Sequence, residues 1–173
     1  MKFLEKDLEQ IIYSADKELL AQRGLEINGT LIRQLRIGNY GTCDLISHKR
    51  PKRDKFLGYT TKGLITVYEL KQDKIGISAF LQALGYLQGI KSYLSKYHED
   101  LVNCYDYRIV LIGKEIDTHS TYCYLPNFTE LNFCDEHVDG HSKFCLENYT
   151  YEYELDGVYF NNCDNFDLEN RGF

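Results

Sequence analysis

The sequence predicts an α/β fold in which a central mixed sheet is flanked by helices. Two observations lead to this class. Hydrophobic residues recur at three- and four-residue steps in two segments, and short runs rich in β-branched and aromatic residues lie between and after them. Over residues 3–113 these helical and strand segments follow the order αβββαβ, the alternation expected of an α/β domain. A length of 173 residues fits a single domain.

The two helical segments are residues 3–22 and 76–97. The first has one apolar stripe and is expected to end at Gly24, because glycine readily adopts the left-handed conformation that closes a helix. Its stripe consists of Leu4, Leu8, Ile11, Ala15 and Leu19. The stripe of the second consists of Ile77, Phe80, Leu84, Leu87, Ile90 and Leu94. Gln82, Tyr86 and Tyr93 share a second face of that helix.

The strand segments are rich in β-branched and aromatic side chains and are separated by turn residues. A Gly-Asn-Tyr-Gly turn at 38–41 separates the first two, and a turn at Leu155-Asp-Gly-Val158 separates the last two. We expect strands at residues 31–37, 42–47, 63–70, 107–112, 122–125, 149–155 and 158–160. The last three are additional C-terminal strands.

The amino-acid composition of the chain, with 43% hydrophobic and 27% charged residues, is typical of a globular protein. It contains no run of eighteen apolar residues, and its first residues turn polar too early for a secretory signal. We therefore expect a cytoplasmic protein whose six cysteines are reduced. One cysteine group has metal-ligand spacing: Cys134, His137, His141 and Cys145 could hold a structural zinc or belong to a polar loop.

The net charge of −6 is unevenly distributed. Residues 1–97 hold sixteen lysines and arginines against ten acids, whereas residues 98–173 hold four against sixteen. We expect one domain with a core at 3–113, the extent of the αβββαβ order, and an acidic C-terminal extension at 114–173. A run of cations near Pro51 is expected either to contact nucleic-acid phosphates or to form a solvated loop. It comprises Lys49, Arg50, Lys52, Arg53 and Lys55.

Three charged residues carry the chemistry. Glu69 and Lys71 are two positions apart at the end of an apolar strand, so they point to one face of the sheet while Leu70 points to the other. Asp44 lies in the preceding strand, inside an apolar run where an acid is unusual. Two carboxylates from neighbouring strands form a site for Mg²⁺ or Mn²⁺, and the lysine can orient or deprotonate a water.

The motifs Gly41-Thr-Cys-Asp-Leu-Ile46, Val67-Tyr-Glu-Leu-Lys71 and Gln82-Ala-Leu-Gly-Tyr86 resemble, in this order, those of PD-(D/E)XK nucleases with a QxxxY element, as in the RecB-like and NucS-like branches. The family's usual proline before the aspartate is replaced by Cys43. The resemblance covers residues 3 to about 113. It implies a restriction-endonuclease-like core and metal-dependent hydrolysis of phosphodiester bonds, with DNA the favoured substrate.

The resemblance also implies roles for particular residues. Asp44, Glu69 and the main chain of Leu70 would hold Mg²⁺ or Mn²⁺, and Lys71 would lie beside the attacking water. Gln82 and Tyr86 would line the groove, although both could be packing residues. The family often adds a glutamate from the first helix.

We expect Glu5 in that role rather than Glu9, since it lies about 70° from the middle of the apolar stripe and Glu9 about 110°. Both could instead be solvated acids favoured by the helix dipole.

Two other functions stay open. The same fold could be an inactive binding module, with the acidic segment at 98–173 covering the groove or meeting a protein partner. Alternatively, the chain could be a regulatory protein organised by zinc at Cys134–Cys145. A homodimer would suit cleavage of both strands of a duplex.

The chain has fifteen tyrosines and no tryptophan. The tyrosines could supply base-stacking surfaces, or serve as core and edge residues.

Overall fold

A six-stranded mixed sheet forms the centre of the molecule, in the order β1-β2-β5-β7-β9-β10. The structure, a computed structural model, describes residues 4–53, 60–117 and 143–163. The strands are β1 Thr30–Arg36, β2 Thr42–Lys49, β5 Gly63–Leu70, β7 Tyr105–Gly113, β9 Phe144–Glu154 and β10 Gly157–Asn162. Strands β5, β7 and β9 pair in parallel, while β1, β2 and β5 at one side and β9 and β10 at the other pair antiparallel. The predicted α/β class with a mixed sheet is confirmed.

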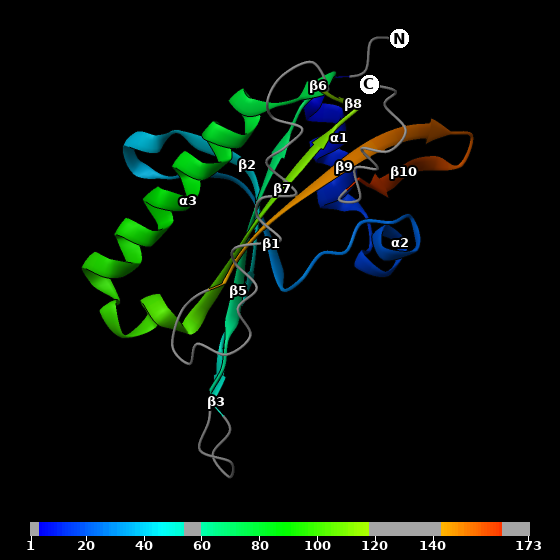
Figure 1. The fold of residues 1–173 in the computed structure, drawn as a ribbon. Helices are drawn as coiled ribbons and strands as arrows, with labels where there is room; N and C mark the ends of the chain where they lie inside the picture. Colours follow the sequence, from blue (N-terminus) through cyan, green and yellow to red (C-terminus); the bar gives the residue numbers. More distant parts are fainter. Residues whose placement is uncertain (1–3, 54–59, 118–142, 164–173) are drawn as a thin grey trace, which may run out of the picture.

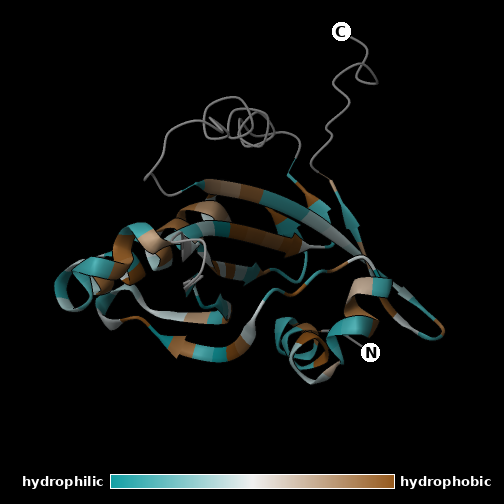
Figure 2. Ribbon diagram, turned by 90° about the horizontal axis from the view of Figure 1, so that it is seen from below, coloured by the Kyte–Doolittle hydropathy of each residue, from teal (hydrophilic) through white to brown (hydrophobic). Residues whose placement is uncertain are grey.

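Helices cover both faces of this sheet (Figure 1). Helix α3, Ile77–Tyr97, packs on one face, and α1, Glu5–Ser14, and α2, Lys17–Gln22, lie on the other. Each face has its own apolar core, and Figure 2 shows the hydrophobic residues, in brown, along the central strands between these layers. None of the helices in the described ranges is both long and apolar enough to cross a membrane.

Short elements mark the two ends of the sheet. The ribbon of β3, Lys52–Arg53, and β4, Thr60–Thr61, follows β2 at one end. Two short paired strands follow β5 and β7 at the opposite end: β6, Lys74–Ile75, and β8, Glu115–Ile116. Two 3-10 turns, η1 Gly38–Tyr40 and η2 Glu99–Cys104, precede β2 and β7. The axis of α3 runs from the β6 end toward the β3 end (Figure 1).

The single helix expected at 3–22 is wrong, because the chain breaks between α1 and α2. The Ser14 hydroxyl bonds back to the Gln10 carbonyl, and the Asp16 carboxylate accepts the Glu18 N–H at 2.8 Å. Such side chains compete with the helical backbone bonds, and aspartate caps a new helix well. After the break Leu20 is buried, and the predicted Leu19 is 38% exposed.

The remaining elements agree with the expected ones within a few residues, and β5 matches its prediction from end to end. The buried face of α3 differs in detail, since Ala79 and Ala83 are buried where Ile77 and Leu84 were expected to be. Small residues let the helix approach the sheet closely. The strand expected at 122–125 lies outside the described residues. The predicted strands at 149–155 and 158–160 are β9 and β10, which belong to the central sheet.

Candidate active site

Strands β2 and β5 bring Asp44 and Glu69 together. Their antiparallel pairing ends at Leu45 and Tyr68, so Asp44 and Glu69 are the next residues of the two strands. The Asp44 Oδ2 atom accepts the backbone N–H of Leu70 at 3.3 Å, which joins the two strands beyond their ladder. The site therefore lies at the end of the sheet from which β6 continues (Figure 1).

Lys71 emerges on the same face as Glu69, as the two-residue period of a strand requires. Its Nζ donates to Glu69 Oε1 at 2.6 Å, and its backbone N–H donates to the Ile112 carbonyl at 2.8 Å. Leu70 is fully buried in the opposite core, against the α1 side. The predicted set of Asp44, Glu69 and Lys71, here called the acid–lysine cluster, is thus assembled in the fold.

Helix α3 adds two further predicted residues, Gln82 and Tyr86. Gln82 Oε1 accepts from Lys71 Nζ at 3.5 Å, and Gln82 Nε2 donates to the Tyr86 hydroxyl at 2.8 Å. The Tyr86 ring lies against Gly41, which has φ +108°; a Cβ there would come within 3.3 Å of the ring. A hydrogen-bonded chain therefore runs from Glu69 through Lys71 and Gln82 to Tyr86, and a glycine makes room for its last member.

Burial dominates the electrostatics of the cluster. The pKa of Glu69 is raised to about 7, mainly by desolvation and to a smaller extent by the charges of Asp44 and Glu5, against the opposing hydrogen bond and charge of Lys71. Desolvation also raises the pKa of Asp44. Burial lowers the pKa of Lys71, but the bond and charge of Glu69 outweigh it and the net pKa is raised. The protein thus holds two acids in a place that disfavours their ionised forms.

Glu69 is only 1% exposed, and its second oxygen, Oε2, is buried without a hydrogen-bond partner among the described residues. A buried carboxylate oxygen without a partner is costly. A hard cation would compensate this oxygen and the nearby Asp44, so the residues fit Mg²⁺ or Mn²⁺. Within the described ranges, however, no three His, Cys, Asp or Glu side chains converge into a ready metal cage.

Cys43 occupies the position where the resembled family has proline. The thiol is buried, its Sγ donates to the Leu45 carbonyl at 3.3 Å, and burial together with the charge of Glu69 raises its pKa. A thiol in these surroundings stays protonated. Cys43 therefore acts as a small packing group beside the two acids.

The first helix contributes two acids in different settings. Glu9 is 3% exposed and is held by Arg33 Nε and by Gln34 Nε2, the latter at 2.7 Å. Glu5 is exposed, and its Oε1 accepts the Gln72 N–H at 3.2 Å. Glu9 is thus already neutralised by a cation, whereas Glu5 lies at the rim of the cluster, one residue past Lys71.

Several contacts around the cluster were not predicted from the sequence. Gln34 lies in β1 between Arg33 and Leu35, which pair with the neighbours of Asp44, and has φ +52°, an uncommon conformation for a residue other than glycine. The Tyr151 hydroxyl donates to the Gln72 carbonyl at 2.7 Å and fixes the segment that follows Lys71. The only sequence signal for the contacts of Arg33 and Gln34 with Glu9 is that two polar residues follow each other within a strand.

The basic run lies at the other end of β2. Lys49 is five residues from Asp44, roughly 16 Å along an extended strand. Lys49, Arg50 and Lys52 line a cavity of about 560 Å³ together with His48, whose Nε2 is 2.8 Å from the Tyr105 hydroxyl.

Burial and the charge of Arg50 lower the pKa of His48. Arg53 is placed only by its backbone in β3, and Lys55 lies outside the described residues. Lys49, Arg50 and Lys52 are therefore not part of the acid–lysine cluster.

The remaining candidate, the zinc group, is described only at Cys145, an exposed residue of β9. Cys134, His137 and His141 lie outside the described residues.

Comparison with known proteins assigns no family and no function to the chain. No protein-family model, no curated protein and no solved structure matches the chain.

Proposed function

We propose that this protein is a metal-dependent nuclease with a restriction-endonuclease-like fold that hydrolyses phosphodiester bonds, with DNA the favoured substrate. The observation that carries the proposal is Glu69, which is buried next to Asp44 with one oxygen on Lys71 and the other without a partner among the described residues. Folding does not require two acids and a lysine to be brought together out of water. Perturbed acids of this kind are concentrated at functional sites.

The roles follow from the donors and acceptors of the cluster. Asp44, Glu69 and the main chain of Leu70 are the groups proposed to hold Mg²⁺ or Mn²⁺, with Glu5 in reach of the rim. A bound cation supplies a Lewis acid that stabilises the charge developing on the phosphoryl group. Lys71 has three N–H donors, of which Glu69 and Gln82 take two among the described residues, so the third can orient the attacking water or a phosphate oxygen.

Gln82 and Tyr86 support this arrangement from the helix. Gln82 accepts from Lys71 and donates to Tyr86, so it limits the directions in which the ammonium can point. A fixed donor contributes more to a transition state than a mobile one, because its orientation is set before the reaction. Both residues are therefore proposed as positioning residues for Lys71.

The test is cleavage of linear, circular, branched and single-stranded DNA in the presence of Mg²⁺ or Mn²⁺, with EDTA in parallel. We expect cleavage of at least one substrate with metal and none with EDTA. The exposed pair Lys74 and Glu115, 3.5 Å apart, provides matched surface controls: changes to these residues should leave the rate unchanged. Binding without cleavage of any substrate would contradict the proposal and favour a binding module.

A further inference from the structure

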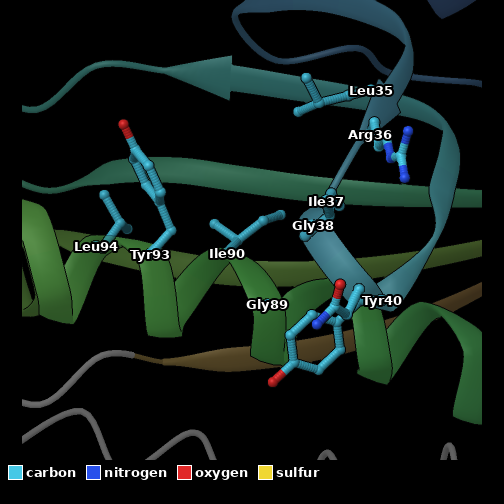
Figure 3. A pocket seen from close by; sticks show the side chains of 10 residues that line it. Leu35, Arg36, Ile37, Gly38, Tyr40, Gly89, Ile90, Tyr93 and Leu94 are labelled. Atoms are coloured by element: carbon cyan, nitrogen blue, oxygen red, sulfur yellow. The ribbon is translucent and has the colours of Figure 1, made fainter.

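A second concave site lies beside the turn at 38–41, the turn that also contacts Tyr86. It has a volume of about 430 Å³ and lies between the chain at 35–40 and the C-terminal half of α3 (Figure 3). Its lining is mainly apolar and includes Leu35, Ile37, Tyr40, Gly89, Ile90 and Tyr93. This volume is in the range of small-molecule pockets. We refer to it as the tyrosine groove.

The groove depends on close packing of η1 against the helix. A Cβ at Gly89 would lie 2.5 Å from Ile37 and 2.7 Å from the Tyr40 ring, so only glycine allows this approach. The next glycine of the turn, Gly41, is the one that packs against Tyr86. The same turn therefore borders both the groove and the last member of the hydrogen-bonded chain.

One face of α3 connects the two sites. Tyr86, Tyr93 and Tyr97 follow at steps of seven and four residues, which keeps them on one side of the helix. At the rise of an α-helix, Tyr93 is roughly 10 Å beyond Tyr86. Helix α3 runs from the β6 end of the sheet toward the β3 end (Figure 1), so Tyr93 lies on the side of Tyr86 that is farther from β6.

Tyr93, which lines the groove, belongs to a cluster of exposed, mutually tilted rings with Tyr97 and His98. Tyr93 is 55% and Tyr97 58% exposed, and their ring centroids are 5.0 Å apart; the His98 ring is 5.8 Å from that of Tyr93. Neither tyrosine belongs to the two apolar cores of the described residues, so this cluster of rings has no evident role in folding. Exposed aromatic rings in sequence along a groove are the surfaces on which unpaired bases stack.

The charges of the groove suit a polyanion. Arg36 belongs to its lining, and Lys96 lies over the Tyr97 ring at 5.1 Å. None of the described lining residues is acidic. The first acids after Tyr97 and His98 in the sequence are Glu99 and Asp100, in η2. A cationic edge beside aromatic faces is the usual combination for binding a single strand without sequence preference.

We propose that the tyrosine groove binds the unpaired bases of a DNA strand, so that the favoured substrate carries a single-stranded end, flap or gap next to the bond that is cut. The assignment of the bound strand as a substrate rests on the proposed function. Bases in a duplex have their faces covered by their neighbours, so a stacking surface can take only unpaired ones. Arg36 is positioned to contact the phosphates of that strand.

The test is a binding measurement in EDTA, where cleavage does not interfere. A labelled oligothymidylate of about twelve nucleotides, within the site sizes of single-strand binders, and a blunt duplex are titrated by fluorescence anisotropy. The variants are Tyr93→Ala and Tyr93→Phe, with Tyr13→Ala as the control, since Tyr13 is 46% exposed on α1 at the other face of the sheet.

We expect Tyr93→Ala to weaken binding of the single strand by about fivefold or more, as loss of one base stack does. Tyr93→Phe keeps the ring and should bind within about twofold of the parent, as should Tyr13→Ala. Affinity for the blunt duplex should change little in any variant. Melting temperatures should be unchanged, because Tyr93 is largely exposed.

Equal affinity of the parent and Tyr93→Ala for the single strand would overturn the inference, as would a parent that binds only the duplex or neither probe. A dimer that dissociates in Tyr93→Ala, without any loss of oligonucleotide affinity, would assign the groove to a second copy of the chain instead. Failure of the proposed function gives a different result, namely Tyr93-dependent binding of the single strand without metal-dependent cleavage of any DNA.

Discussion

Glu69 should reduce the stability of the protein at neutral pH, and the size of this effect can be worked out from its surroundings. Its pKa is raised from 4.5 in an unfolded chain to about 7. One pH unit of displacement corresponds to ~1.4 kcal/mol, so ionising Glu69 in the fold costs about 3 kcal/mol relative to ionising it in the unfolded chain. This value already includes the favourable bond to Lys71.

The pH dependence has a definite sign. A folded-state pKa above the unfolded value gives stability that is fully present below pH 4.5 and is lost as the pH rises through about 7. Glu69→Gln resembles the protonated side chain at every pH. The free energy of unfolding of this variant, relative to the parent, should therefore increase by up to about 3 kcal/mol between pH 4.5 and pH 8.

Urea denaturation at a series of pH values in EDTA measures this difference. Any constant cost of the amide, such as a lost bond to Lys71, cancels when the two ends of the pH range are compared. Glu115→Gln is the matched control, since Glu115 is a paired but exposed glutamate; it should shift stability by less than about 0.5 kcal/mol at either pH. A gap between Glu69→Gln and the parent that does not change with pH would refute the reasoning.

Three other changes test separate parts of the structure. Asp44→Asn should abolish the rise in melting temperature that Mn²⁺ gives the parent by binding the native state, and an undiminished rise would remove Asp44 from the proposed ligands. Replacing Arg50 and Lys52 with alanine should lower the salt dependence of DNA binding by about one to two units of slope; an unchanged slope would make the basic run a solvated surface. Asp16→Ala should cost roughly 1 kcal/mol in urea denaturation because the N-cap of α2 is lost, whereas no cost would mean that the cap is dispensable.

Strand β5 shows why much of the fold could be predicted. Its eight residues are strongly β-forming, and its two-residue period put Glu69 and Lys71 on one face before any tertiary contact was known. The break between α1 and α2 was missed although Ser14 and Asp16 signal it. The prediction relied on the continuous apolar stripe and did not take into account the local hydrogen bonds that end the first helix.

The candidate site was predictable only where its residues are close in sequence or lie on regular elements. Burial of Glu9 depends on Arg33 and Gln34, and the latter has a positive φ that no periodic pattern reveals. The tyrosine groove likewise requires η1 to pack against Gly89, a contact between segments about fifty residues apart. Such features arise from tertiary packing and do not repeat along the chain.

The measurement that tests the central claim most directly is the single-turnover cleavage rate of Lys71→Met beside Lys74→Met. Both changes replace an ammonium with an apolar group of similar length, but Lys71 lies 2.6 Å from buried Glu69 and Lys74 3.5 Å from exposed Glu115. We predict that the rate falls at least about a hundredfold in Lys71→Met, measured at a temperature where the variant is folded, and stays at the parent value in Lys74→Met. Equal rates in the two variants, or no metal-dependent cleavage by the parent, would contradict the account.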